Sequence, residues 1–311
     1  MTPRVQRFAV CGAGFIGRSL IDHLLMAGHD VNVLDHKGIP PDLVGRVTWS
    51  DGEFANRADL ERTLAGVDVA FHLISSTVPG DVDVDPIAEL SENMFSTIAF
   101  LDVCTTCNVK RVVFVSSSSV YGLQQSTPIR EDAQTNPISS HGIQKLTIEK
   151  YLLLYQFHRG IDVRIVQLAN PFGPGQALYG RQGFVALAIG QLLRNEPILL
   201  RDAGRPIRDF IYIDDVSRAL VLAAVMDYAP AIINIGSGVG HSLQQVIDVV
   251  RSVVGHPIAT VAGELRKAEI PVSVLDVERA RECLGFVPRV SLSDGLALTV
   301  RHHRSATPVI G

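Results

Sequence analysis

The sequence predicts an α/β fold in which helices cover both faces of a parallel sheet, followed by a less regular C-terminal part. One observation is the alternation of short apolar runs with segments of helical period through the first half of the chain. A second is the glycine-rich turn that joins the first apolar run to the first helical segment. The 311 residues, 47% of them hydrophobic, are sufficient for a large buried core.

The predicted elements of the first half follow one another in strand and helix order. Short apolar runs predict buried strands at Arg7–Cys11, Val31–Asp35, Val67–Leu73, Arg111–Ser116 and Asp162–Leu168. Apolar residues at helical spacing predict helices at Phe15–Ala27, Asp59–Ala65, Glu89–Cys107 and Ser140–Arg159. Because parallel strands need crossover helices, this order favours a doubly wound parallel sheet.

The second half shows fewer regular patterns. Strands are predicted at Arg208–Ile213 and Ile232–Gly236, and helices at Phe184–Asn195, Asp215–Met226 and Leu243–Val254. Ser242 is the predicted N-cap of the last of these helices. The segment Gly173–Gly183 is rich in Gly and Pro and is predicted to be a substrate loop. We expect the stretch after Val300 to be loosely ordered.

Composition excludes several classes of partner. The net charge of −4 and the 19% of charged residues lack the basic footprint of a nucleic-acid-binding protein. No apolar segment has the length of a signal peptide or membrane span, so we expect a cytoplasmic protein with no membrane partner. Cys104 and Cys107 form a CxxC, but without further ligands at matching spacing they are interpreted as helix residues, and no metal site is predicted.

Gly12, Gly14 and Gly17 form a GxGxxG turn between the first strand and the first helix. Glycines here permit a tight turn, close approach of a pyrophosphate and close packing of helix on strand, and the helix N-terminus attracts phosphate. Asp35 ends the second strand, 21 residues after Gly14. A carboxylate there accepts hydrogen bonds from the ribose hydroxyls of NAD and repels the 2′-phosphate of NADP. The predicted cofactor is therefore NAD.

Further motifs follow in order along nearly the whole chain. They are Phe71–Ser75 (FHLIS), Val115–Gly122 (VSSSSVYG), Asn136–Lys145 (NPISSHGIQK), Ala169–Gly175 (ANPFGPG), Arg208–Asp215 (RDFIYIDD) and Leu284–Pro288 (LGFVP). Together they resemble the extended short-chain dehydrogenase/reductase family, in its sugar-nucleotide epimerase/dehydratase branch. The resemblance implies a Rossmann-type NAD-binding domain over residues 1–170. It also implies a nucleotide-sugar-binding domain over residues 171–311, with some strands returning to the first sheet.

The resemblance implies a catalytic set of Ser/Thr, Tyr and Lys. Ser117 matches the serine and Lys145 the lysine, but His141 stands where the tyrosine is expected. His141 and Lys145 are four residues apart on a predicted helix, so both side chains can reach one site.

Three interpretations of His141 are open. In the first, neutral imidazole is the base, because its unperturbed pKa of about 6.5 suits proton transfer near neutral pH and Lys145 disfavours a second positive charge. In the second, activity is weak or lost and the protein only binds its ligands. In the third, His141 is a deliberate replacement of the tyrosine, made to trap a complex.

The resemblance also implies which residues contact the ligands. For the cofactor, beyond the glycines and Asp35, these are Phe15, Ile16, Glu53, Phe54, Leu73 and Lys145. For a nucleotide-diphosphate sugar they are Ser118, Asn170, Arg208, Arg266 and Ser273. Guanidinium groups suit bidentate contact with phosphate oxygens, which fits the two arginines to the diphosphate. Ser273 matches a position that limits the size of the sugar, and a small residue there would admit an N-acetyl group.

Ser118 and Ser119 decide between the reactions of the family. Dehydratases carry an Asp-Glu pair at these positions and decarboxylases a glutamate in the same turn, so both reactions are disfavoured. The favoured reaction is NAD-dependent epimerisation at sugar carbon 4, which needs no further acid or base. The alternatives are a 4-ketoreductase and a non-catalytic protein that binds NAD and a sugar nucleotide. The resemblance also implies a homodimer, formed through the helices Glu89–Cys107 and Ser140–Arg159.

Overall fold

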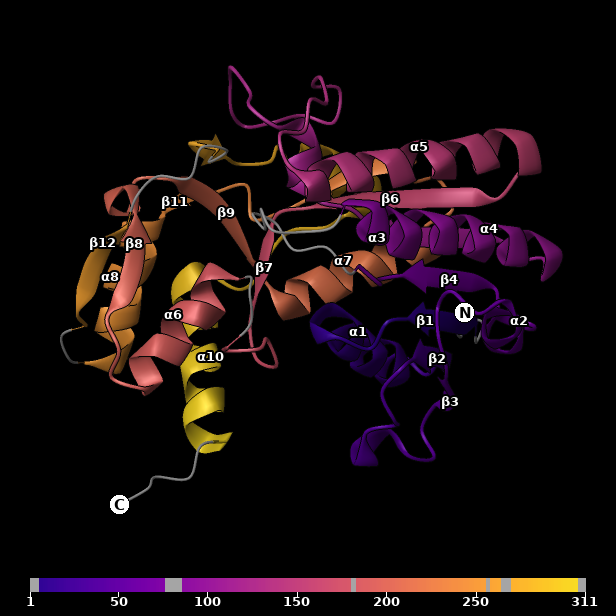
Figure 1. Ribbon diagram of the computed structural model, residues 1–311, viewed down its shortest axis with the longest axis horizontal. Helices are drawn as coiled ribbons and strands as arrows, with labels where there is room; N and C mark the ends of the chain where they lie inside the picture. The colour runs from indigo at the N-terminus through magenta and orange to yellow at the C-terminus, as the bar shows by residue number, and fades with distance from the viewer. Residues whose placement is uncertain (1–5, 76–85, 180–182, 256–257, 264–269, 307–311) are drawn as a thin grey trace.

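The computed structural model describes residues 6–75, 86–179, 183–255, 258–263 and 270–306 (Figure 1). Within them, seven parallel strands form the main sheet in the order β10–β6–β5–β4–β1–β2–β3. The strands are β1 (Arg7–Cys11), β2 (Asp30–Asp35), β3 (Thr48–Asp51), β4 (Val69–His72), β5 (Arg111–Val115), β6 (Asp162–Leu168) and β10 (Ile232–Ile235). The predicted fold class, a doubly wound parallel sheet, is confirmed.

Helices cover both faces of this sheet (Figure 1). One layer contains α2 (Arg57–Leu64), α4 (Ser96–Thr106) and α5 (Ser140–Arg159), and the other contains α1 (Phe15–Met26), α7 (Ile213–Val225) and α9 (Glu278–Leu284). In β1, Phe8 and Val10 belong to one core cluster, whereas Ala9 and Cys11 belong to the other. Burial of successive side chains on opposite faces explains why the strands are continuous apolar runs.

The chain passes from β1 outward to β2 and β3, then returns to β4 on the other side of β1. Strand order therefore reverses between β1 and β4. In open parallel sheets, ligands bind in the crevice at the carboxyl ends of the strands where such a reversal occurs.

The second lobe is built around β9 (Ile207–Tyr212). Its neighbours are β11 (Gly240–Ser242), which is antiparallel, and β13 (Val272–Ser273) and β7 (Asn170–Phe172), which are parallel. A separate pair joins β8 (Ile198–Arg201) to β12 (Thr260–Gly263). The helices of this lobe are α6 (Phe184–Leu193), α8 (Leu243–Val254) and α10 (Leu292–Ala306). Short 3₁₀ turns are η1 (Pro41–Leu43), η3 (Ser118–Tyr121) and η4 (Asp202–Gly204).

Two expectations from the sequence need correction. The stretch after Val300 is not loosely ordered as far as Ala306, because α10 continues to that residue and buries Leu296 and Val300. The helix expected over Glu89–Cys107 is not a single α-helix. It consists of α3 (Pro86–Leu90), a π-helical turn η2 (Ser91–Phe95) and α4.

Side chains in and just after the π-helical turn donate to backbone carbonyls four residues earlier in the chain. Asn93 Nδ2 donates to Glu89 O at 3.0 Å, and Thr97 Oγ1 donates to Asn93 O at 2.5 Å. Such bonds compete with the regular helical ladder, which accounts for the change of helix type. Among the described residues, no helix combines the length and apolar character needed to cross a membrane.

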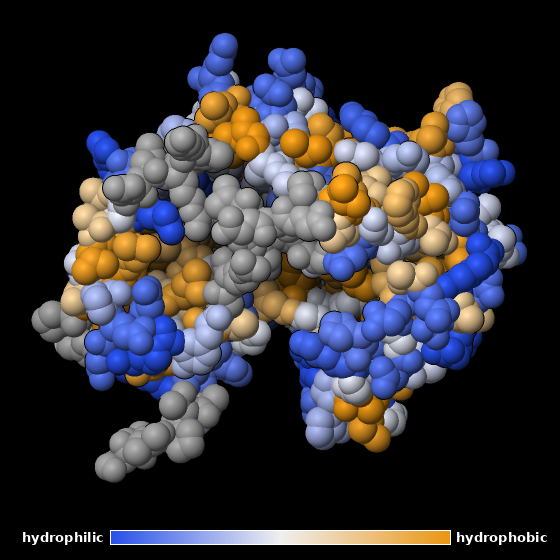
Figure 2. Space-filling model, in the orientation of Figure 1, coloured by the Kyte–Doolittle hydropathy of each residue, from blue (hydrophilic) through white to orange (hydrophobic). Residues whose placement is uncertain are grey.

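Large apolar side chains are exposed over α3, η2 and α5. Figure 2 shows apolar residues gathered over these helices at the upper right. The exposed side chains here, named the helical apolar surface below, are Ile87, Leu90, Phe95, Ile143, Leu154 and Phe157. Phe157 is 84% exposed, which is unusual for a phenylalanine in a folded domain.

Candidate active site

The glycine turn after β1 has the geometry that the motif requires. Gly12 has φ of +100°, a region that favours glycine, and its amide donates to Leu34 O at 2.9 Å. A Cβ at Gly17 would lie 1.9 Å from Gly12 O, so only glycine lets α1 pack against the turn. A Cβ at Gly14 would meet nothing within 4 Å, which leaves open space beside the N-terminus of α1. This open cradle fits a pyrophosphate.

Asp35 ends β2 beside this turn. Its Oδ2 accepts a hydrogen bond from Ala13 N at 2.7 Å, and its Oδ1 accepts one from Lys37 N at 2.9 Å. A carboxylate has about four acceptor positions, so lone pairs are left for two ribose hydroxyls. The backbone thus fixes the carboxylate at the cradle, and these residues fit NAD.

Most of the other residues expected at the cofactor lie along the same edge of the sheet. Phe15 and Ile16 form the first turn of α1. Leu73 N donates to Cys11 O at 3.0 Å, which holds the end of β4 against the glycine turn. Glu53 follows β3 and is exposed.

Phe54 also follows β3, but its ring packs into the core. The ring centroid lies 4.7 Å from that of His72 and 5.3 Å from that of Phe100. Burial, together with the smaller effect of the nearby Lys145 charge, lowers the pKa of His72 to about 3. His72 is therefore a neutral core residue, and Phe54 belongs to the same aromatic cluster.

Lys145 lies inside the protein at the end of β5. Its Nζ donates to Val115 O at 2.9 Å and lies 4.7 Å from the centroid of the Phe114 ring. Burial lowers the pKa of Lys145 to about 8, and the carboxyl group of Glu149 partly opposes this effect. An ammonium has three donors, so the bond to Val115 leaves donors for a ligand.

His141 lies one helical turn before Lys145, in the first turn of α5, and is 9% exposed. Ser139 caps this helix, with its Oγ accepting from Gly142 N at 3.1 Å. A Cβ at Gly142 would lie 2.7 Å from Ser119 O, so the start of α5 packs directly against η3. The positive end of the helix dipole favours a neutral imidazole at this position.

Ser117 connects β5 to η3, two residues after the carbonyl that holds Lys145. Its Oγ accepts from Ser119 N at 3.2 Å and from Ser119 Oγ at 3.0 Å. Ser118 is half-buried in the same turn. Ser117, His141 and Lys145 thus come together where β5 ends and α5 begins.

The second lobe contributes a row of side chains on one sheet face. In the strand register, Arg208 of β9 pairs with Ser273 of β13 and with His241 of β11, while Asn170 of β7 pairs with Phe210. Paired residues share a face, as do residues two apart on one strand, so all five point the same way. Asn170, Arg208 and Ser273 were predicted from the sequence as substrate contacts, whereas His241 was not. Arg266, the remaining substrate candidate, lies outside the described residues.

Asp209, which was also not predicted from the sequence, points to the opposite face and accepts several hydrogen bonds there. This buried carboxylate accepts bonds from Ser237 N at 2.7 Å, Ser237 Oγ at 2.6 Å and Gly238 N at 3.1 Å. Its backbone carbonyl accepts from Asn170 Nδ2 at 2.8 Å. Burial raises the pKa of Asp209, and the bonds from Ser237 and its neighbours oppose that rise. The feature of the sequence that could have identified Asp209 is its position in the RDF motif, directly after Arg208.

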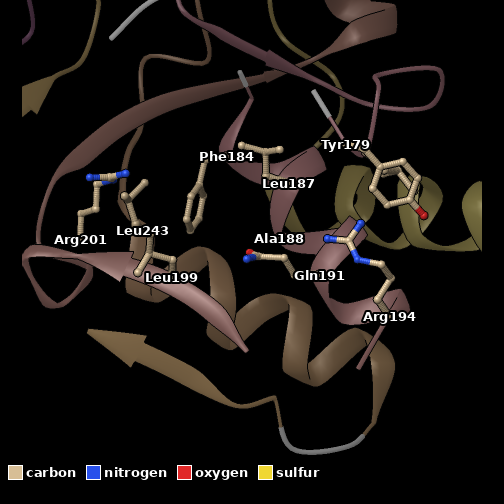
Figure 3. A pocket seen from close by; sticks show the side chains of 10 residues that line it. Tyr179, Phe184, Leu187, Ala188, Gln191, Arg194, Leu199, Arg201 and Leu243 are labelled. Carbon is tan, nitrogen blue, oxygen red and sulfur yellow. The ribbon is translucent and has the colours of Figure 1, made fainter. Parts of the chain in front are cut away.

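A cavity of about 380 Å³ lies between α6, β8 and the start of α8 in the same lobe (Figure 3). Phe184, Gln191 and Leu199 face it, with Arg201 at one end and Tyr179 and Arg194 at the other. Leu243 also lines it, and its amide donates to Pro206 O at 3.1 Å, two residues from Arg208. Within the described residues, no cluster of His, Cys, Asp and Glu is arranged to hold a metal ion.

Comparison with known proteins agrees with this geometry. The NAD dependent epimerase/dehydratase family matches residues 9–236. A UDP-glucose 4-epimerase of Mycolicibacterium smegmatis is 32% identical over 96% of this chain and 99% of its own length. The structure of UDP-glucose 4-epimerase from Thermotoga maritima with UDP-glucose is similar, with a TM-score of 0.90, 30% identity and coverage of 96% and 99% of the two chains. That of the Thermus thermophilus UDP-glucose 4-epimerase with NAD has a TM-score of 0.89 at 26% identity, covering 97% and 100%.

Proposed function

We propose a specific reaction for this chain, which belongs to the NAD dependent epimerase/dehydratase family: the reversible inversion of carbon 4 in a UDP-hexose, with NAD as cofactor. The observation that carries the proposal is the meeting of Ser117, His141 and Lys145 at the junction of β5 and α5. The names of similar proteins, which are UDP-glucose 4-epimerases, support the choice of nucleotide and of carbon 4.

His141 is the proposed base of this reaction. NAD held by the glycine turn, Asp35 and Lys145 would supply a reversible hydride acceptor for carbon 4, whose configuration inverts when the hydride returns to the opposite face of the sugar. The imidazole holds the proton of the 4-hydroxyl while that carbon is a ketone, and Ser117 donates a hydrogen bond to the same oxygen. The proton goes back to the oxygen when the hydride returns, so no net oxidant or reductant is consumed.

The surroundings of His141 support a neutral, proton-accepting imidazole. The N-terminus of α5 and the ammonium of Lys145, one turn along the helix, both disfavour a second positive charge. Lys145 is proposed to hold the nicotinamide ribose with the donors that Val115 leaves over. The glycine turn and Asp35 are the proposed pyrophosphate and ribose contacts.

The second lobe is the proposed site for the nucleotide sugar. Arg208 and Arg266 would hold the diphosphate, and Asn170 the adjoining part of the nucleotide sugar. The base would enter the adjoining cavity, where Phe184 and Leu199 offer apolar contacts and the Gln191 amide a donor and an acceptor. These assignments correspond to an NAD-binding domain over residues 1–170 and a substrate domain over residues 171–311.

The same turn argues against elimination or decarboxylation. Ser118 and Ser119 follow Ser117 in η3, and neither can act as a carboxylate acid or base. Ser119 Oγ instead donates to Ser117 Oγ at 3.0 Å. The proposed reaction therefore consists only of hydride and proton transfer at carbon 4 and its hydroxyl, with no elimination of water and no loss of CO2.

A homodimer through the helical apolar surface is also proposed. Its six exposed side chains lie on α3, η2 and α5, in or next to the segments Glu89–Cys107 and Ser140–Arg159 that the family resemblance implies as the subunit contact. Burying such a surface against a second copy would remove apolar area from water. Sedimentation of the protein at micromolar concentration tests this, with a dimer expected and a monomer contradicting it.

The proposed reaction is tested by incubating the NAD-loaded protein with UDP-galactose and, separately, with UDP-glucose. Chromatography should detect interconversion to the same equilibrium mixture from both sides, without added NADH or NADPH. A requirement for stoichiometric reduced cofactor and a 4-keto sugar would identify a ketoreductase instead. Binding of UDP-sugar and NAD with no conversion would identify a non-catalytic binding protein.

A further inference from the structure

A cluster of buried polar side chains joins the π-helical turn η2 to the first turn of α5, beside His141. It contains Glu89 from α3, Asn93 from η2 and Gln144 from α5. Their exposed fractions are 6%, 6% and 3%, so very little of each residue is in contact with water. Because buried polar groups must find hydrogen-bond partners inside the protein, the contacts of this cluster hold the two segments together.

The carboxylate of Glu89 lies at the centre of the cluster. Its Oε2 accepts from Gln144 Nε2 at 2.7 Å and from Ser140 Oγ at 2.7 Å. Gln144 Nε2 also donates to Ser140 Oγ at 3.0 Å, which closes a triangle of three polar atoms. Ser140 directly precedes His141, and Gln144 follows it by three residues. The carboxylate is therefore bonded to α5 on both sides of the proposed base.

A backbone carbonyl fixes the orientation of both amide groups in the cluster. Asn93 Nδ2 donates to Glu89 O at 3.0 Å, and a carbonyl oxygen can only accept. The same nitrogen donates its second hydrogen to Gln144 Oε1 at 2.9 Å. Gln144 must then present its NH2 group to the Glu89 carboxylate. Turning either amide over would bring two acceptors together, so the arrangement is uniquely assigned.

The cluster continues beyond Asn93 to the end of β4. Thr97 Oγ1 donates to Asn93 O, and His72 Nε2 lies 2.8 Å from Thr97 Oγ1. Since the Thr97 hydroxyl gives its hydrogen to a carbonyl, the hydrogen of the second contact belongs to His72 Nε2. His72 directly precedes Leu73, whose amide is bonded to the glycine turn. The first turn of α5 is thus tied, through η2, to the proposed cofactor edge of the sheet.

We propose that Glu89 and Gln144 are a pair of positioning residues, which place His141 by holding the residues adjacent to it in α5. This role rests on the proposed function, in which His141 is the base, and it requires neither side chain to touch a ligand. A misplacement of about 1 Å can cost a hundredfold in rate. A shift of the first turn of α5 would therefore slow proton transfer.

The pair adds something that the start of α5 does not need for helix formation. Ser139 already caps the helix through the amide of Gly142. Ser140 and Gln144 are four residues apart, so both lie on the helix face that is turned towards η2. Two contacts along that face fix the rotation of α5 about its axis, and this rotation sets the direction of His141.

Exchanging the two side chains tests the pair. Gln144→Glu alone would bring two carboxylates together where Nε2 and Oε2 now lie 2.7 Å apart, and their repulsion should displace the first turn of α5 from η2. Glu89→Gln alone keeps an oxygen that can accept both bonds and should do less. The double variant should restore the cluster, because the introduced amide donates to the introduced carboxylate. That carboxylate also accepts from Asn93 and Ser140.

Initial-rate kinetics of the proposed epimerisation separate positioning from stability, at saturating NAD and at a temperature where circular dichroism shows each variant folded. Gln144→Glu should lower kcat by about tenfold or more. KM for the UDP-sugar should stay within about twofold, because the proposed substrate contacts lie on the second lobe. The double variant should recover kcat to within about threefold of wild type. Gln156→Glu, the same substitution at an exposed position of α5, is the matched control and should change neither constant.

Three results would overturn the positioning role. One is an unchanged kcat in Gln144→Glu. Another is a double variant no more active than Gln144→Glu, since the two residues would then not act as a pair. The third is a raised KM at constant kcat, which would assign the pair to ligand binding. If Gln144→Glu does not fold, the double variant decides: a folded, active protein supports the pair, and an unfolded one contradicts it.

Hydrogen exchange at the start of α5 tests the same contacts without substrate or turnover. Backbone amides over residues 142–146 should exchange about tenfold faster or more in Gln144→Glu, and at the wild-type rate in the double variant. Equal exchange in wild type and Gln144→Glu would show that the pair does not hold this turn. Absence of turnover in the wild type would refute the proposed function, while the exchange result would still decide whether the pair holds α5.

Discussion

The two walls of the candidate site are built differently. On the catalytic wall, Lys145 is buried and bonded to a backbone carbonyl of β5, and His141 is buried beside a close contact of α5 with η3. On the substrate wall, Arg208 is half-buried and its neighbours belong to strands of two and three residues. A group that transfers a proton must be held in a fixed position, because a small misplacement costs rate. Groups that select a substrate can lie on short strands and loops, where the sequence varies more readily than in the core elements.

The largest effect is expected at the cofactor edge of the catalytic wall. Gly17→Ala would place a Cβ 1.9 Å from Gly12 O, so the turn and α1 must separate, and both stability and NAD binding should be lost. Gly14→Ala meets no protein atom, so the fold should persist, but the methyl group fills the pyrophosphate cradle and NAD affinity should fall at least tenfold.

Thermal unfolding and NAD titration separate these two variants. Gly38→Ala is the matched control, because a Cβ there meets nothing within 4 Å and the residue is exposed, so both quantities should stay unchanged. A Gly14→Ala protein that binds NAD normally would show that the cradle is not the pyrophosphate site.

A smaller effect is expected at Arg208 on the substrate wall. Arg208→Gln removes charge-assisted hydrogen bonds worth about 1.5–3 kcal/mol, so KM for the UDP-sugar should rise roughly ten- to hundredfold. NAD affinity should not change, because the proposed cofactor contacts lie on the catalytic wall. Isothermal titration measures the NAD affinity, and initial-rate kinetics measure KM for the UDP-sugar. Equal losses for both ligands would show that Arg208 does not act on the sugar nucleotide alone.

The smallest effect is expected at Ser273, which is buried beside Arg208. Ser273→Tyr adds a ring where an N-acetyl group is proposed to fit. The ratio of kcat/KM for UDP-N-acetylglucosamine to that for UDP-glucose should fall by about tenfold or more. Competition between the two sugar nucleotides measures this ratio directly. An unchanged ratio would show that Ser273 does not limit the size of the sugar that binds.

The same contrast explains what could be predicted from sequence. The strand Asp162–Leu168 and the helix Ser140–Arg159 were predicted with the observed bounds, because burial on both faces or on one helical stripe leaves a regular apolar pattern. Ser242 was correctly identified as the N-cap of α8, where it forms a capping box with Gln245. Each of these signals is local in the sequence.

The substrate wall carries little local signal. Strands β7, β11 and β13 have two or three residues, too few to show alternation, and they exist because β9 pairs with them. His241 joins the row beside Arg208 only through that long-range register. The buried contacts of Gln167 with Glu149 and Tyr121 likewise join segments that are distant in the sequence.

The central claim is that His141 is the base, and kcat for UDP-hexose 4-epimerisation in variants of this residue tests it most directly. His141→Phe removes the proton acceptor while keeping a planar ring, and kcat should fall by roughly 10²–10⁴. His141→Tyr should also lower kcat, because a phenol reaches further than an imidazole and would displace the sugar hydroxyl from the proposed base position. Turnover that persists in His141→Phe, or that rises more than about tenfold in His141→Tyr, would contradict the account.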